Sequence, residues 1–343
     1  MTPAELRRRR AAAQLLGRHE RTEPAGAVAH LLAVQAQDLR AARLALRARG
    51  AASTPGDVDA ALGADGSLVV AWLMRGTLHL VAREDHAWLL ALTAGQNAAT
   101  IRRRLGQLGV SDADAARAVA VVERALAEEG PLPRPQLAER LRAAGLPAEG
   151  QAVPHLLALA AGRATIVLGP VQDGGHAFAL ARDWLGRARP SLDRDVALAE
   201  LARRYLRGHG PAGAADLAAW SGLGLRDARA GLAAISGELE QTGDLVDLAG
   251  RSRPPRRARP RLLGAFDPYL LGWKDRSFAV DPAHARRVHP GGGIVRATAI
   301  ADGRAVATWT MRSGRVALDP FTPMAPALHG ALRREAERVA RFA

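Results

Sequence analysis

The sequence of 343 residues contains no cysteine and only one lysine, Lys274. The absence of thiols excludes disulfide bonds, iron–sulfur clusters and zinc sites built from thiolates. A Walker-type phosphate loop requires a lysine followed by serine or threonine, and the only lysine lies in Gly-Trp-Lys-Asp, so this loop is excluded as well. The ten histidines have no convincing ligand spacing, and we expect neither a metal ion nor a cofactor.

Long apolar runs are also lacking. No stretch is apolar enough to span a bilayer, and the arginine-rich N-terminus has no apolar region of the kind that signal peptides carry. The serine-hydrolase motif Gly-x-Ser-x-Gly and the zinc-protease motif His-Glu-x-x-His are absent. The sequence therefore predicts a soluble, cytoplasmic protein that belongs to neither of these hydrolase classes.

Arginine supplies nearly all of the positive charge. Lysine and arginine number 48 against 34 aspartates and glutamates, which gives a formal net charge of +14 and an isoelectric point of about 11.4. A protein with this charge attracts polyanions, and the planar guanidinium group is well suited to forked contacts with phosphate. Nucleic acid is the predicted partner, and an anionic membrane is the weaker alternative.

Helical patterns dominate the first two thirds of the chain. Helices are predicted to begin at Thr2-Pro3 and near Pro24, to cover residues 38–49, and to follow Thr54-Pro55. The period then changes, because SLVVAWLM and TLHLVA are typical of two short strands, joined at Arg75-Gly76. Helices followed by a small hairpin are the order of elements in a winged helix-turn-helix domain.

This order of elements recurs twice further along the chain. Gly130-Pro131 matches Gly210-Pro211, and Leu137 matches Leu217 at the same offset. The hairpin of the first recurrence is predicted to turn at Gly174-Gly175. Three candidates in series indicate a repeated supersecondary unit.

The last part of the chain has a different character. An arginine- and proline-rich segment, residues 251–261, predicts an exposed linker, and strands with turns and a final basic helix follow. We predict an α+β, mainly helical fold of about three tandem winged helix-turn-helix domains and a C-terminal β-rich segment. The predicted boundaries are 1–110, 111–190, 191–250 and 251–343.

Three segments together carry a resemblance to a known family: AVQAQDLRAARLALRAR, WLMRGTLHLV and FDPYLLGWKDR. In this order they resemble the winged-helix DNA glycosylases of the AlkZ and YcaQ type, and the resemblance covers nearly the whole chain. It implies tandem winged helices in a C shape around a basic channel for duplex DNA. It also implies a catalytic Gln-x-Gln signature, which marks the AlkZ-like branch and is Gln35-Ala36-Gln37 here.

The implied reaction is hydrolysis of the bond between a damaged base and deoxyribose. Ordinary glycosidic bonds need an acid and a base, commonly two carboxylates. An N7-alkylated purine is already cationic and leaves without protonation, so an amide oxygen that holds a water and faces the charge developing at C1′ can suffice. We therefore expect a monomeric, monofunctional glycosylase that acts on bulky or cationic N7-alkylated purines in double-stranded DNA, crosslinks included, in repair or in self-resistance to a genotoxic natural product.

The spacing of Gln35 and Gln37 makes a prediction about local structure. Side chains two residues apart diverge by about 200° on a helix and share a face in an extended segment. We expect a break between a helix that ends near Val34 and one that begins near Asp38, with Asp38 as its N-cap or, less favoured, as a carboxylate base. Thr77 and His79, on one face of a predicted strand, either support the glutamines or are ordinary core residues.

The candidate DNA contacts are Arg40, Arg43, Arg47, Arg75, Lys274, Arg276, Arg286, Arg287 and His289. The first three are spaced for one helix face, which either binds phosphate or is merely solvated. Residues 286–293 are predicted to form a basic hairpin or loop that probes the DNA groove. The alternative to a glycosylase is a non-catalytic winged-helix DNA-binding protein, such as a transcriptional regulator, which would leave the glutamine pair unexplained.

Overall fold

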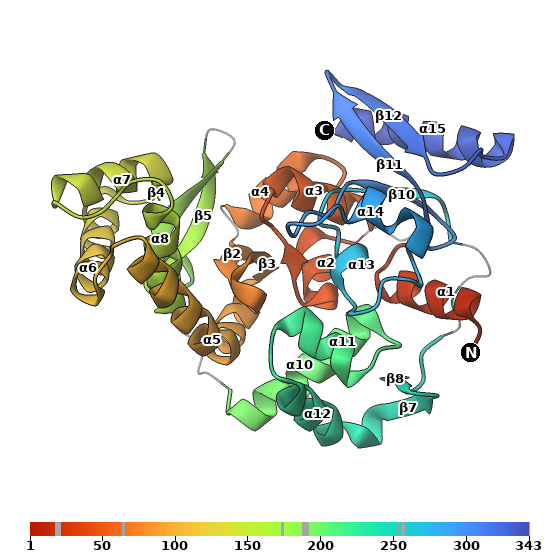
Figure 1. The fold of residues 1–343 in the computed structure, drawn as a ribbon, viewed down its shortest axis with the longest axis horizontal. Helices are drawn as coiled ribbons and strands as arrows, with labels where there is room; N and C mark the ends of the chain where they lie inside the picture. Colours follow the sequence, from red (N-terminus) through yellow and green to blue (C-terminus); the bar gives the residue numbers. More distant parts are fainter. Residues whose placement is uncertain are drawn as a thin grey trace. The chain divides into compact units, whose positions relative to one another are not determined.

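The computed structural model describes residues 1–17, 22–63, 66–172, 175–186, 192–252, 254 and 258–342. The fold is α+β and about half helical, and it divides into two compact units (Figure 1). The first unit combines residues 1–58 with residues 195–343, and the second unit consists of residues 59–194. Among the described helices, none has the length and apolar character needed to cross a membrane.

The first unit begins with three helices and one short strand. They are α1 (Pro3–Ala13), α2 (Pro24–Leu31), β1 (Val34–Gln35) and α3 (Leu39–Ala48). The predicted start of α1 is confirmed, because the Thr2 hydroxyl accepts a hydrogen bond from the Glu5 amide at 3.2 Å. The predicted starts near Pro24 and Asp38 are confirmed as well.

The remaining elements of the first unit come from the C-terminal part of the chain. A helical group and a hairpin come first: α10 (Arg194–His209), α11 (Ala214–Ser221), α12 (Leu225–Ala234), β7 (Leu239–Thr242) and β8 (Leu245–Leu248). The β-rich part follows: β9 (Arg261–Leu263), α13 (Pro268–Leu271), α14 (Ala285–Val288), β10 (Thr298–Ala301), β11 (Arg304–Arg312), β12 (Arg315–Pro320) and α15 (Pro326–Phe342). Four of these strands form an antiparallel sheet in the order β12-β11-β10-β9.

Helix α3 packs on this sheet together with α15, so the start and the end of the chain share a core. The core residues are Leu44 of α3, four residues of the sheet and four of α15: Leu262, Ala299, Ala307, Trp309, Leu332, Ala336, Val339 and Phe342. The Trp309 indole also donates to the Leu263 carbonyl at 2.8 Å. Figure 1 shows the red and orange N-terminal helices lying among the blue C-terminal elements.

A second core of the first unit is aromatic. Tyr269 and Trp273, in the segment FDPYLLGW, are each 1% exposed, so this segment is mostly core. The Arg10 guanidinium lies over the rings of Trp273 and Phe278, with centroids at 4.9 and 4.4 Å. His209 stacks on Tyr205 with 4.6 Å between ring centroids. The helix α1 is therefore held through its arginine against residues more than 250 positions away.

The second unit is built around an antiparallel sheet with helices packed beside it. Helix α4 (Pro55–Leu62) begins in the first unit and ends in the second. The other elements of the second unit are β2 (Leu68–Trp72), β3 (Leu78–Ala82), α5 (His86–Gln107), α6 (Asp112–Glu129), β4 (Leu132–Pro133), α7 (Arg134–Ala143), α8 (Ala152–Gly162), β5 (Ile166–Gln172), β6 (Gly175–Leu180) and α9 (Ala181–Trp184). Strand β2 pairs with β3 and meets β5, and β6 joins β5 to β4.

The recurring pattern seen in the sequence has matching structural positions. Leu137 of α7 and Leu217 of α11 are 0% and 1% exposed, so each fixes its helix to a core. The predicted hairpins β5–β6 and β7–β8 are present, although Gly174 of the first tip lies outside the described residues. The boundaries of the two compact units differ from those of the four segments predicted from the sequence. The four segments therefore remain a prediction.

Candidate active site

The segment that carries Gln35 and Gln37 is not helical: Val34 and Gln35 form β1, and the chain bends at Gln37 and Asp38. Helix α2 ends at Leu31, and Leu32 adopts a positive φ of 68°, which turns the chain out of the helix. Val34 and Ala36 are 0% and 3% exposed, whereas Gln35 is half-buried and Gln37 is exposed. The expected helix break is confirmed, and it begins earlier than expected because Val34 and Gln35 form β1.

Burial alternates along this segment, since Val34 and Ala36 are buried and the two glutamines are not. The two glutamines differ in their surroundings, because one is half-buried and the other is open to solvent. The half-buried Gln35 already engages other groups of the protein. Two amides on one short segment offer two carbonyl acceptors and two NH₂ donors without any formal charge.

Asp38 is the N-cap of α3, as predicted. One of its carboxylate oxygens accepts hydrogen bonds from the backbone N–H groups of Arg40 at 2.9 Å and Ala41 at 3.2 Å. These bonds satisfy two of the amides that the first turn of a helix leaves without partners. The cap fixes the point at which the glutamine segment becomes helix.

Buried contacts that the sequence does not indicate hold α3 in place. Arg49, directly after the helix, donates to both carboxylate oxygens of Asp267, at 3.0 and 2.9 Å, and to the Gln14 amide oxygen at 2.7 Å. Gln14 in turn donates to the Gly208 carbonyl at 2.6 Å. Of these residues, only Asp267 has a sequence signal for its role. It precedes Pro268, a position typical of a helix N-cap, and it does cap α13.

A close approach on the sheet side fixes α3 further. A Cβ added to Gly264 would lie 3.1 Å from the Leu44 Cβ and 3.2 Å from the Ala41 carbonyl oxygen. Any larger residue at this position would push the helix off the end of β9. The glutamine segment is therefore attached to a helix whose position is set on two sides.

The three arginines of α3 do not share one environment. Arg40 is exposed and Arg43 is half-buried. The Arg47 side chain is only 11% exposed and donates to Glu335 of α15 at 2.9 Å. Arg47 therefore connects α3 to α15, and we do not retain it among the DNA contacts.

The predicted DNA contacts between residues 274 and 289 also differ in their environments. Lys274 is exposed, whereas Arg276 is half-buried and burial lowers its pKa. Arg287 pairs with Asp319 at 2.7 Å and lies over the Phe321 ring, while Arg286 is exposed. Burial and the nearby Arg276 lower the pKa of His289 to about 4, so this ring is neutral at neutral pH and adds no positive charge.

The glycine run after His289 makes a tight turn. Gly291, Gly292 and Gly293 all have positive φ values, and Gly291 forms an antiparallel bridge with Ile294. Ile294 is 52% exposed at this turn. The expected hairpin or loop is thus a compact turn with an exposed apolar side chain, and the exposed Arg286 precedes it in the sequence.

Arg75, Thr77 and His79 belong to the second unit. The DNA contact of Arg75 and the support of the glutamines by Thr77 and His79 therefore stay predictions. Within that unit the Thr77 hydroxyl donates to the Met74 carbonyl at 3.1 Å. His79 is 2% exposed and its Nδ1 lies 3.0 Å from the Thr77 carbonyl oxygen. Burial, with a smaller effect of Arg75, lowers the pKa of His79 to about 3, so the ring is neutral.

Within the ranges that the structure describes, no three His, Asp or Glu side chains gather closely enough to hold a metal ion. The candidate site consists of two amides on a short non-helical segment, and exposed cationic side chains belong to the same unit. This combination fits the class of the DNA glycosylases. The chain belongs to the DNA glycosylase AlkZ-like family, whose model matches residues 28–342.

A curated sequence and a solved structure, both from Streptomyces sahachiroi, agree with this assignment. A curated protein described as "Interstrand DNA cross-link repair glycosylase" is 27% identical over 352 residues, covering 94% of this chain and 91% of the relative. The solved structure of Streptomyces sahachiroi DNA glycosylase AlkZ matches with a TM-score of 0.84 at 25% identity. That match covers 100% of this chain and 96% of the relative.

Proposed function

We propose that this DNA glycosylase removes bulky or cationic N7-alkylated purines from duplex DNA with Gln35 and Gln37 as its catalytic residues. The observation that carries the proposal is the presence of both amides on one short non-helical segment, in which the buried Val34 and Ala36 alternate with the less buried glutamines. A carbonyl oxygen of this pair binds the attacking water, and its partial negative charge faces C1′ as positive charge develops there. The second amide orients the first or the water.

The chemistry of the pair limits the substrate. An amide cannot protonate a leaving base, and the only carboxylate within the motif, Asp38, is engaged in capping α3. The damaged base must therefore leave without being protonated. A purine alkylated at N7 can do so because it already carries a positive charge. This reasoning supports selectivity for activated lesions and protection of unmodified bases.

The relative from Streptomyces is described as acting in interstrand cross-link repair, and we extend this substrate class to the present chain. A crosslink through N7 of two purines has the same cationic leaving group at each end. We further propose hydrolysis without lyase chemistry, since the only lysine of the chain, Lys274, is exposed and lies in a segment predicted to face phosphate. The product is then an abasic site in an intact strand.

Duplex DNA is bound, in this proposal, by a basic channel formed by tandem winged helices. The exposed cations Arg40, Lys274 and Arg286 in the first unit, with Arg75 in the second, are the retained phosphate contacts. The half-buried Arg43 supports the same surface. The compact turn at Gly291 to Gly293 enters the groove beside the lesion. A purely DNA-binding regulator is not favoured, because the family is one of glycosylases.

The experiment uses a duplex with one N7-methylguanine, followed by alkali to cleave abasic sites. Gln35→Ala and Gln37→Ala should each lower the rate of base release by about 10²–10³-fold, the cost of losing one positioned dipole. The control is Asp38→Asn, which preserves the cap and should retain activity. Loss of activity in Asp38→Asn would instead make Asp38 the base, and efficient release of uracil would reveal an acid outside the motif.

A further inference from the structure

The turn that leads into the glutamine segment has an unusual backbone conformation. Leu32, directly after α2, has φ 68° and ψ −42°. Helices often end on a left-handed residue, but such a residue has a positive ψ of about 47°, and bulky side chains with positive φ are outliers. The nearest described conformation is the rare, strained form of the γ-turn. A glycine would adopt it at less cost, yet the sequence has a leucine here.

The core holds the strained leucine on both sides. Leu31 and Leu32 are 0% exposed, and Ala33 and Val34 are 2% and 0% exposed. The Leu32 side chain therefore anchors the turn in the interior, which a glycine cannot do. The burial of its neighbours prevents the backbone from relaxing into an ordinary conformation. The half-buried Gln35 follows this buried run directly.

Helix α10 fixes the end of α2, from which the turn starts. Arg204 of α10 donates to the Ala29 carbonyl at 2.7 Å. One helical turn later, Gly208 lies so close to α2 that an added Cβ would be 3.1 Å from the Leu31 Cα and 3.2 Å from the His30 carbonyl oxygen. All of these residues belong to the first unit. The end of α2 thus has one position relative to α10.

We infer that Leu32 is a positioning residue for the reaction and acts through the backbone on Gln35. The inference rests on the proposed function, in which the Gln35 amide faces the charge that develops at C1′. Such a group must be in place beforehand, and a displacement of about 1 Å can cost about 10²-fold in rate. The buried, strained leucine restricts residues 33–35 in a way that a glycine turn would not. Because Leu32 is 0% exposed, it touches neither the DNA nor the attacking water.

The test compares Leu32→Ala with Leu32→Gly in the full-length protein. Both variants lose the anchoring side chain, and only glycine relieves the strain. Leu32→Gly should therefore have the higher midpoint of urea denaturation. Its single-turnover rate of N7-methylguanine release should nevertheless be about tenfold below that of Leu32→Ala, at equal affinity for undamaged duplex. A purely structural role would make the more stable variant at least as active.

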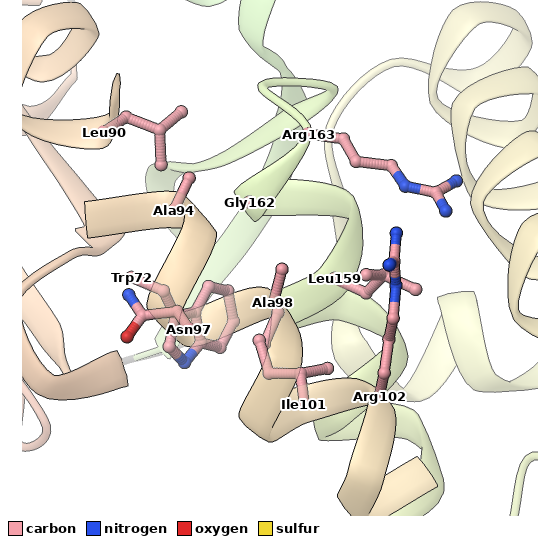
Figure 2. Close-up of a pocket in the computed structure, with 11 residues that line it drawn as sticks. Trp72, Leu90, Ala94, Asn97, Ala98, Ile101, Arg102, Leu159, Gly162 and Arg163 are labelled. Carbon is pink, nitrogen blue, oxygen red and sulfur yellow. The ribbon is translucent and has the colours of Figure 1, made fainter. Parts of the chain in front are cut away.

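Leu159 of α8 is the control for this pair of substitutions. It lines a hollow of about 50 Å³ between α8 and α5 (Figure 2) and is 2% exposed within an ordinary helix. Glycine is less favourable than alanine inside a helix, so Leu159→Gly should have a lower urea midpoint than Leu159→Ala. Both Leu159 variants should release the base at the same rate.

A second test keeps the leucine and moves the end of α2. Gly208→Ala adds one methyl group against α2 and should lower the single-turnover rate about three- to tenfold, because α2 must shift by a fraction of an ångström. The matched control is Gly169→Ala in β5, a buried position where an added Cβ would lie 3.0 Å from the Ala179 Cβ. The control should lower the urea midpoint to a similar extent and leave the rate unchanged.

A double substitution tests the route through Gln35. In Gln35→Ala, the further change Leu32→Gly should leave the remaining rate unchanged, because the amide that the turn positions is gone. The inference is overturned if Leu32→Gly is as active as Leu32→Ala, if Gly208→Ala is as active as Gly169→Ala, or if Leu32→Gly still slows Gln35→Ala. Beside an inactive Gln35→Ala, these outcomes leave the proposed function standing. A fully active Gln35→Ala contradicts the proposed function and this inference together.

Discussion

Arg49 and Asp267 form a doubly hydrogen-bonded ion pair in which each side chain is 0% exposed. The pair joins the end of α3 to the cap of α13 across 218 positions of sequence. Burying two charges is costly, and only the matched fork geometry and the further bond from Arg49 to Gln14 offset that cost. The pair therefore specifies where α3 ends, and with it the position of the glutamine segment at the other end of the helix.

Breaking this pair should destabilise the protein strongly. Asp267→Asn keeps the shape of the side chain and leaves Arg49 as a buried cation without its counterion. We expect a loss of about 3–5 kcal/mol in the free energy of unfolding, measured from urea denaturation. Adding Arg49→Met to Asp267→Asn should recover part of the loss, since no unpaired charge then remains. The exposed pair Arg140 and Glu129 is the control, and Glu129→Gln should change little. Equal effects of the two single substitutions would refute the structural role of Asp267.

Substitution of Arg40 should weaken DNA binding and substitution of Arg47 should lower stability, although both residues belong to α3. Arg40→Gln removes an exposed phosphate contact and should lower the slope of log K against log salt by about 1 for binding to undamaged duplex. Arg47→Gln should leave that slope unchanged and lower the stability by about 1–3 kcal/mol, because the Glu335 side chain, 3% exposed, loses one of its two arginines. A lowered slope in Arg47→Gln would return this residue to the DNA surface.

The stability of the protein should fall in mild acid because of two buried histidines. Burial lowers the pKa of His79 and of His209 to about 3, against 6.5 for an exposed histidine. Between these values the unfolded chain binds a proton at each site and the folded chain does not, so acid favours unfolding. Each histidine contributes a slope of about 1.4 kcal/mol per pH unit in this window.

Variants isolate the contribution of each histidine. His79→Leu and His209→Phe should each reduce the slope of the unfolding free energy between pH 6 and pH 4 by about that amount per unit. The comparison uses slopes rather than absolute stabilities, so a constant packing penalty of the substitution cancels. Carboxylates contribute equally to the wild type and the variants. An unchanged slope in both variants would show that these rings are protonated in the folded state.

Local rules predicted much of this fold. The caps at Thr2 and Asp38, the hairpin after α4 and the helix break at the glutamines depend on neighbours within a few residues, so the sequence contains the information. Helix α5 escaped prediction because Gly95 and Asn97 interrupt a weak pattern, and packing on α8 supports it instead.

The unpredicted parts of the site are non-local. The spacing of Arg40, Arg43 and Arg47 indicates a shared helix face but not that Glu335, 288 positions away, pairs with Arg47. The partners of Gln14 and Arg49 lie 194 and 218 positions away. Pairings of this kind depend on the tertiary arrangement, which one sequence does not reveal. The burial of Arg276 and His289 also depends on the tertiary arrangement and was not predicted from the sequence.

Helix α3 shares its core with α15, although 288 positions separate Arg47 of α3 from its partner Glu335. The glutamines and α3 are neighbours in sequence, yet α3 packs against Leu332, Val339 and Phe342. A fragment that carries the glutamines without α15 would expose the apolar side of α3 to water. The glutamine motif is therefore not a portable peptide, and grafting it into another protein would require a surface that replaces α15.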